Sequence, residues 1–61
     1  MLYLANIMYA DGSEAKSFKF KKDAEKWLDE KNNNFEYETR IDILDATGNY
    51  VDSYIYTAKK E

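Results

Sequence analysis

Two carboxylates, Asp42 and Asp52, are the side chains whose type and spacing come nearest to supporting catalysis. They fall in two segments that read as the strands of one hairpin, where the side chains could lie opposite each other. Paired carboxylates can act as general acid and base or hold a metal ion. With Arg40 beside them, a solvated and charge-balanced strand surface is the simpler interpretation, because carboxylates are common on surfaces. We therefore predict no catalytic and no metal-binding residue.

The composition excludes most other chemistry. The 61 residues include no histidine and no cysteine, which rules out imidazole acid–base catalysis, thiolate nucleophiles, thiolate zinc sites and disulfides. The sequence has no nucleophile elbow and no phosphate-cradling glycine loop, and both of its glycines fit hairpin turns. We expect a protein that is not an enzyme and needs no cofactor.

Tyrosine is the over-represented residue. Aromatic residues make up 16% of the chain, and six of them are tyrosines. Tyrosine and arginine are enriched at binding hot spots, although a single tyrosine is better explained by its preference for strands. Five tyrosines, however, alternate along two predicted strands with an arginine nearby, and such a set predicts a binding surface. The predicted partner-binding residues are Tyr3, Tyr9, Arg40, Tyr50, Tyr54 and Tyr56.

Five elements would position these residues. The spacing of Ala24, Trp27 and Leu28 predicts one helix over 22–33. The element order favours a single domain over 1–61 of the α+β class, a small ββαββ fold with a four-stranded, mostly antiparallel sheet and the helix packed on one face. The first strand is apolar on both faces, which favours an inner position, and the strand order is otherwise open. The predicted strands are 2–10, 14–20, 36–45 and 50–57.

Two local signals indicate where elements end. Asn32 begins a run of three asparagines, which tolerate left-handed backbone conformations and end helices. Residues 45–48 have the pattern of a type I turn closed by a left-handed glycine, Gly48.

The first turn decides which residues face the helix. Asp11-Gly12 is a strong hairpin signal, and a tight two-residue loop would place Phe18 and Phe20 on the face of Tyr3 and Ala5. A type I turn with a glycine bulge would match the phenylalanines to Leu4 and Leu2 instead, and we prefer this register because it gives the better core. The tyrosines then project from the opposite, uncovered face. The predicted core consists of Leu2, Leu4, Phe18, Phe20, Trp27, Leu28, Ile41, Ile43, Val51 and Ile55.

Net charge and hydropathy restrict the partners and the location. The formal net charge is −3, which disfavours general nucleic-acid binding because phosphates attract a basic face. A local run of lysines around Phe18 and Phe20 is similar to a single-strand-binding surface, but the predicted core requires both phenylalanines. No apolar run approaches the roughly 18 residues that span a bilayer, and the apolar start reads as a strand rather than a leader. We expect a cytoplasmic protein that does not enter a membrane.

These observations favour a protein-interaction module that acts through the tyrosine-bearing sheet face or a sheet edge. Its partner would be a second copy, giving a homodimer, or a heterologous target. In size and acidic composition the whole chain resembles accessory and inhibitor proteins of bacteriophages and mobile elements, which occupy surfaces of host enzymes, including defence nucleases; no motif specific to a named family is present. The alternative is a protein that sequesters a nucleotide between tyrosines, with Arg40 on a phosphate. A structural subunit of a larger assembly is also compatible with the sequence.

Overall fold

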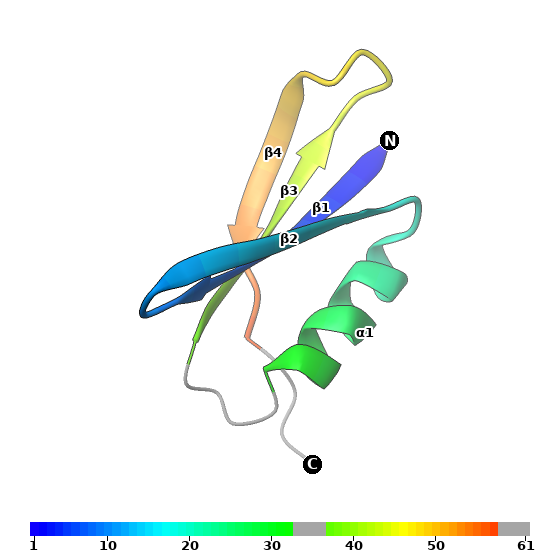
Figure 1. The fold of residues 1–61 in the computed structure, drawn as a ribbon. Coiled ribbons are helices and arrows are strands. Elements are labelled where there is room, and N and C mark those ends of the chain that lie inside the picture. Colours follow the sequence, from blue (N-terminus) through cyan, green and yellow to red (C-terminus); the bar gives the residue numbers. More distant parts are fainter. Residues whose placement is uncertain (33–36, 58–61) are drawn as a thin grey trace.

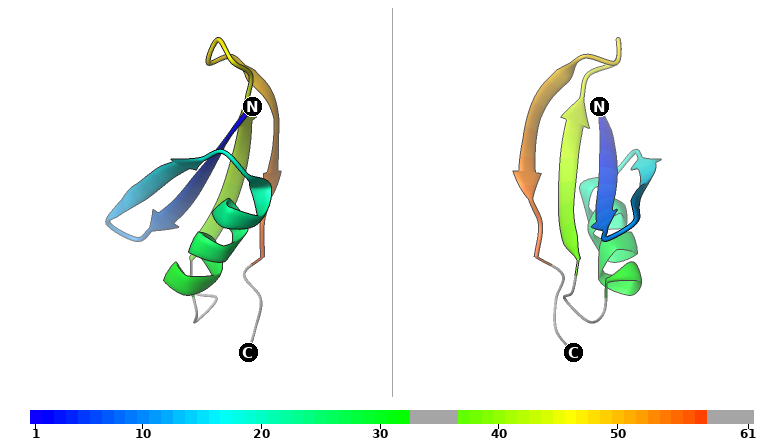
Figure 2. Two further views of the ribbon diagram at one scale, coloured as in Figure 1. Left: turned by 90° about the vertical axis from the view of Figure 1, so that its right-hand side faces the viewer. Right: turned by 60° about the vertical axis from the view of Figure 1, so that its left-hand side comes forward.

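The computed structural model describes residues 1–32 and 37–57 of the chain. The strands form one antiparallel sheet in the order β2-β1-β3-β4, and the helix lies against one face of it (Figures 1 and 2). The predicted α+β class and the ββαββ order are confirmed, and so is the inner position of the first strand. The elements are β1 (Leu2–Tyr9), β2 (Gly12–Phe18), α1 (Lys21–Lys31), β3 (Glu38–Leu44) and β4 (Tyr50–Ile55).

The helix α1 packs on the sheet through one narrow stripe. Ala24 and Leu28, one turn apart, are fully buried, and Trp27 is partly buried beside them. Phe20 is the extended N-cap residue of α1, so the predicted continuation of the second strand to residue 20 is wrong. The helix ends at the start of the predicted asparagine run: Asn32 is its C-cap, with a φ of −113° rather than a left-handed conformation, and its N–H donates to Leu28 O at 2.9 Å. Residue 33, the predicted last residue of the helix, lies outside the described residues. No helix in the described part of the chain is long and apolar enough to cross a membrane.

The first hairpin has the tight two-residue loop that we did not prefer, and Phe18 lies on the face of Tyr3 and Ala5, as that alternative predicted. Its two-residue loop is Ala10-Asp11, one position earlier than expected, and Tyr3 lies opposite Phe18. The preferred register, with Leu4 opposite Phe18, is therefore wrong by one residue, and this exchanges the two faces of β1. Gly12 is the first residue of β2 and does not have a positive φ.

The core consequently lies on the other face of β1 from the one predicted. Ala5, Ile7 and Ile41 are fully buried with the two helix residues Ala24 and Leu28. Because Ala5 is small, the helix can approach β1 closely, and larger aromatic side chains fill the space around this contact. These partly buried residues are Tyr3, Tyr9, Phe18, Trp27, Tyr54 and Tyr56. Among the residues predicted for the core, Leu2, Phe20, Val51 and Ile55 are instead exposed.

A bulge in the second hairpin separates tyrosines that the sequence spaces evenly. Tyr54 lies opposite Ile41, on the side of the helix. Tyr50 lies opposite Leu44, on the other side of the sheet, because the pairing shifts by one residue between Ile43 and Leu44. One extra residue in β4 therefore places Tyr50 and Tyr54 on opposite faces.

The turn of the second hairpin has the predicted chemistry. The Gly48 N–H donates to Asp45 O at 3.1 Å, and Gly48 has a φ of 89°. The Asp45 carboxylate accepts hydrogen bonds from the Thr47 hydroxyl at 2.6 Å, the Thr47 N–H at 2.9 Å and the Asn49 N–H at 3.1 Å. These bonds, the one from the Thr47 hydroxyl above all, hold the pKa of Asp45 below its ordinary value.

Candidate functional site

One face of the sheet carries no helix from the described residues, and we call it the open face. Its side chains alternate along each strand with those that meet α1, so its membership follows from the strand registers. It has small residues along β2, large apolar residues along β1, and a polar group at its centre on β3. The open face consists of Ser13, Ala15 and Ser17 of β2, Leu2, Leu4, Asn6 and Met8 of β1, Glu38, Arg40, Asp42 and Leu44 of β3, and Tyr50, Ser53 and Ile55 of β4.

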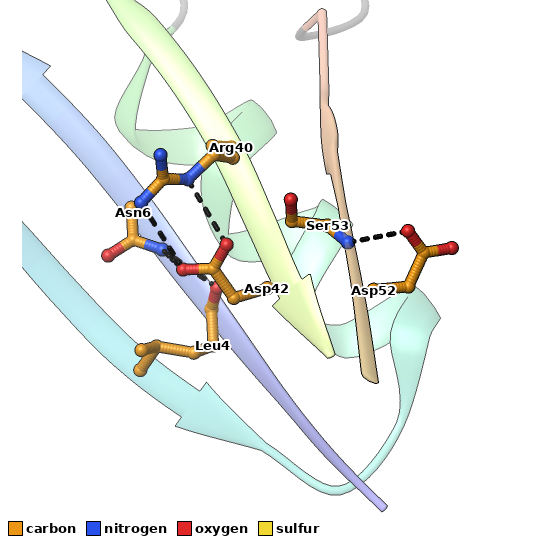
Figure 3. Close-up of polar contacts among 6 residues, drawn as sticks. All are labelled: Leu4, Asn6, Arg40, Asp42, Asp52 and Ser53. Carbon is orange, nitrogen blue, oxygen red and sulfur yellow. Dashed lines mark hydrogen bonds and ion pairs between the residues drawn. The ribbon is translucent and has the colours of Figure 1, made fainter. Parts of the chain in front are cut away.

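Asp42 lies at the centre of the open face and is 3% exposed, although no helix covers it. Arg40 and Asn6 cover its carboxylate (Figure 3). Arg40 Nε lies 3.1 Å from Asp42 Oδ1, and Arg40 Nη2 donates to Asp42 Oδ2 at 3.4 Å. Asn6 Nδ2 donates to the same Oδ2 at 3.0 Å and to Leu4 O at 3.0 Å. The carboxylate is thus neutralised by a bidentate arginine and held by residues of β1 and β3.

Arg40 retains donors that point away from this pair. A guanidinium group has five N–H bonds, and the contacts with Asp42 use one on Nε and one on Nη2. No acceptor for the others is found among the described residues, and the Arg40 side chain is 52% exposed. Arg40 can therefore donate to a carboxylate, phosphate or carbonyl oxygen supplied by another molecule.

Apolar side chains surround this polar centre. Leu2, Met8 and Ile55 are exposed by 40%, 52% and 65%, and Tyr50 by 70%. Leu4, another residue predicted for the core, also lies here and is only partly buried. An arginine with free donors, surrounded by exposed apolar side chains, has the composition of a binding hot spot.

A shallow hollow of about 390 Å³ lies at the β4 side of the open face. It brings Arg40 and Tyr50 together, the two predicted partner-binding residues that share this face. Asp42 and Asp52 also line it, so the hollow holds more negative than positive groups and does not favour a phosphate. Its lining residues are Arg40, Asp42, Tyr50, Val51, Asp52 and Ser53.

The other four predicted partner-binding residues face the helix. Tyr54 and Tyr56 donate from their hydroxyls to Glu25 at 3.1 Å and Asp29 at 2.9 Å, both on α1. Tyr3 and Tyr9 also pack against the buried core. The expectation that all five tyrosines share the uncovered face with Arg40 is therefore wrong. The one-residue change in the first loop moves Tyr3 and Tyr9, and the bulge in β4 moves Tyr54 and Tyr56 away from Tyr50.

The tyrosines on the helix side have structural partners. Burial, reinforced by the hydrogen bond to Asp29, raises the pKa of Tyr56 to about 12. Burial and the bond to Glu25 likewise raise the pKa of Tyr54. Both hydroxyls therefore remain protonated donors near neutral pH, and they fasten β4 to the helix.

The carboxylate pair considered for catalysis is not formed. Asp42 lies opposite Ser53 on the open face, whereas Asp52 lies opposite Ile43 and accepts a hydrogen bond from the Ser53 N–H at 2.8 Å (Figure 3). Within residues 1–32 and 37–57, no group of three or more acidic side chains is arranged to hold a metal ion.

Sequence reasoning missed Leu2, Met8, Asn6 and Ile55 as members of the candidate site. The alternation of Leu2, Leu4 and Met8 was visible, but it was equally compatible with a core face. In comparisons with known proteins, no family model, no curated protein and no solved structure matches this chain.

Proposed function

We propose that the protein is a non-enzymatic interaction module that binds another protein through the open face. The observation that carries this proposal is the half-exposed Arg40, with unused N–H donors, in the middle of the exposed side chains Leu2, Met8 and Ile55. A patch of exposed apolar side chains on a small soluble protein usually marks an interaction site.

The partner is a protein surface that combines apolar side chains with an acidic side chain or a free backbone carbonyl. The apolar part would cover Leu2, Met8 and Ile55, and the oxygen would accept from the outer edge of Arg40. Because Asp42 already neutralises this arginine, one carboxylate is a better match than a strongly acidic surface. The two longer dimensions of the molecule are 34 and 25 Å, so its face is on the scale of the roughly 800 Å² that each partner gives to a standard interface.

An inhibitor that occupies the surface of a host enzyme, as accessory proteins of phages and mobile elements do, is one form of this function. Such a role requires a rigid contact surface and no catalytic group. The nucleotide-binding alternative relied on several tyrosines beside Arg40, and only Tyr50 shares the hollow with it. A cytoplasmic location, expected from the sequence, is part of this proposal.

Two matched substitutions test the proposed face. Ile55→Ser removes an apolar side chain that is 65% exposed on the open face, and Phe20→Ser removes one that is 63% exposed at the start of the helix. Proteins captured from the source cells by the full chain would be identified, and the affinity of each purified complex measured by calorimetry. We expect Ile55→Ser to raise Kd about tenfold or more, as loss of a hot-spot side chain does, and Phe20→Ser to leave Kd unchanged. Equal affinities for the two variants would contradict the proposal.

A further inference from the structure

The two edge strands of the sheet, β4 and β2, differ in how accessible their unpaired backbone groups are to another strand. On β4, the Ser53 N–H donates to the Asp52 carboxylate at 2.8 Å, and the pairing shift near Ile43 adds a bulge. A bulge is a device that prevents another strand from pairing at an edge, and an N–H that is already bonded to a side chain is not free to donate to such a strand. The opposite edge, β2, is described over its whole length and has neither a bulge nor a side chain that caps a backbone N–H.

The outward backbone groups of β2 follow from its loop. A two-residue loop is closed by a hydrogen-bonded pair, here Tyr9 with Gly12, and hydrogen-bonded pairs then alternate along the ladder. The N–H and C=O groups that point away from β1 are therefore those of Ser13, Ala15 and Ser17. All three residues are exposed, and their small side chains leave the edge accessible.

We propose that β2 pairs in antiparallel orientation with β2 of a second copy, around a two-fold axis at Ala15. In this register Glu14 lies opposite Lys16 of the second copy, and Lys16 lies opposite its Glu14. Opposite charges that face each other across an antiparallel pair stabilise it. The two-fold symmetry forms this contact twice, so the edge is complementary to itself.

Other registers lose this complementarity. A two-fold axis at Glu14 or at Lys16 brings two like charges together. An axis at Ser13 or at Ser17 places both charged residues opposite uncharged ones. Lys16 and Glu14 therefore discourage other strand pairings and favour the one centred on Ala15.

The neighbouring contacts hold Glu14 on the helix side of the sheet, where this pairing needs it. Its carboxylate accepts from the Tyr9 hydroxyl at 2.8 Å and lies 3.5 Å from Lys31 Nζ. Pairing the two edges gives one continuous sheet, with both helices on one side and both open faces on the other. This arrangement does not depend on the proposed function, but it would present the open face twice to a partner.

Charge exchange tests the register. The mass of the full chain in solution would be measured by sedimentation velocity over a range of concentrations, with folding checked by circular dichroism. Lys16→Glu places two pairs of like charges across the axis, and we expect it to weaken dimerisation about tenfold or more. The double variant Glu14→Lys with Lys16→Glu restores opposite charges and should restore the dimer. Lys26→Glu makes the same charge change on the helix and should have no effect.

Disulfide cross-linking gives an independent readout. The chain has no cysteine, so each introduced thiol is unique. Ala15→Cys brings two thiols together at the axis, whereas Ser13→Cys leaves them about four residues, or ~13 Å, apart, beyond the reach of roughly 7 Å for a disulfide. We expect Ala15→Cys to form covalent dimers under mild oxidation at least tenfold faster than Ser13→Cys or the β4-edge variant Ser53→Cys.

Three results would overturn the proposal. The first is a chain that stays monomeric at about 1 mM, where even a weak pair would form. The second is a dimer that Lys16→Glu leaves unchanged. The third is cross-linking of Ser53→Cys at the rate of Ala15→Cys. A dimer lost in Lys16→Glu while the partner still binds the open face would leave the proposed function intact.

Discussion

The hydroxyls of Tyr54 and Tyr56 link the C-terminal end of the sheet to the helix, and both act as hydrogen-bond donors. Tyr54 donates to Glu25 and Tyr56 to Asp29. Burial raises the pKa of both phenols, and so does the neighbouring carboxylate, because an ionised phenol would place a second negative charge beside it; the pKa of Tyr56 is raised to about 12. The unfolded chain ionises its tyrosines near the ordinary pKa of about 10. The stability from these bonds is therefore fully present below pH ~10 and is lost as pH rises through the pKa of the folded state.

Alkaline unfolding tests this link at Tyr56. We expect the free energy of unfolding of the wild type to fall between about pH 10 and 12. Tyr56→Phe should be less stable by about 0.5–1.5 kcal/mol at pH 7, because one hydrogen bond is lost, and should lose less on going to high pH. Urea titrations at a series of pH values measure both effects. Tyr50→Phe, at a residue 70% exposed, is the control and should follow the wild type. An alkaline loss as large in Tyr56→Phe as in the wild type would contradict the assignment.

Asp42 stabilises the open face in a different way, as the shared acceptor of Arg40 and Asn6. Asp42→Ala leaves the partly buried Asn6 amide and the Arg40 guanidinium without their shared acceptor, and we expect a loss of about 1–3 kcal/mol. Glu38→Ala removes an exposed carboxylate from the same strand and the same face, and should change stability by no more than about 0.5 kcal/mol. Chemical denaturation compares the two variants. Equal stabilities would mean that the covered carboxylate contributes no more than a surface one.

At the scale of elements, local patterns identified the strands and the helix but not the faces they present. The helix depends on the short-range spacing of Ala24 and Leu28, and the second turn on residues next to Gly48. In contrast, the face of β1 depends on a loop position that differs by one residue, and that of Tyr50 on a single extra residue in β4. Both faces of β1 are largely apolar, so hydrophobicity could not select between them.

The burial of Asp42 at the centre of the candidate site could not be predicted from the sequence, for a related reason. Arg40 was predicted as a partner-binding residue, and it does lie on the open face. The burial of Asp42 depends on Asn6, which is 36 positions away in sequence and contacts it only once β1 and β3 pair in their observed register. A contact between distant strands leaves no periodic signal in the sequence.

Alanine substitutions at the two glycines should change the stability in opposite directions. A Cβ added at either position would meet no heavy atom within 4 Å, so the two sites differ in backbone conformation rather than in space. Gly48 has a φ of 89°, and Gly48→Ala should cost about 1–2 kcal/mol. Gly12 lies in a strand without a positive φ, and Gly12→Ala should be neutral or stabilise by about 0.5–1 kcal/mol. Thermal unfolding of the pair measures the difference, and the reverse order would show that the second turn does not hold Gly48 in this conformation.

At the scale of the whole molecule, the helix and the sheet share a single small core on one face. Among the described residues, the fully buried apolar side chains are Ala5, Ile7, Ala24, Leu28 and Ile41. The open face adds no covered apolar layer on the other side. At roughly 0.05–0.15 kcal/mol per residue, a chain of this length has a total stability of about 3–9 kcal/mol. A single buried contact between helix and sheet therefore contributes a large fraction of the free energy of unfolding.

Leu28→Ala should therefore unfold the sheet together with the helix. Leu28 is the largest helix side chain that is fully buried, and truncating such a residue costs about 2–5 kcal/mol, which is comparable to the total. We expect far-UV circular dichroism to lose strand and helix signals in one transition, at a lower temperature than in the wild type. Lys26→Ala, on the exposed side of the same helix, should be close to neutral. A sheet signal that persists after the helix has melted would show that the strands are stable alone.

If the open face binds a partner as proposed, an excess of that partner should raise the melting temperature of Leu28→Ala, because binding to the folded state alone stabilises it by mass action.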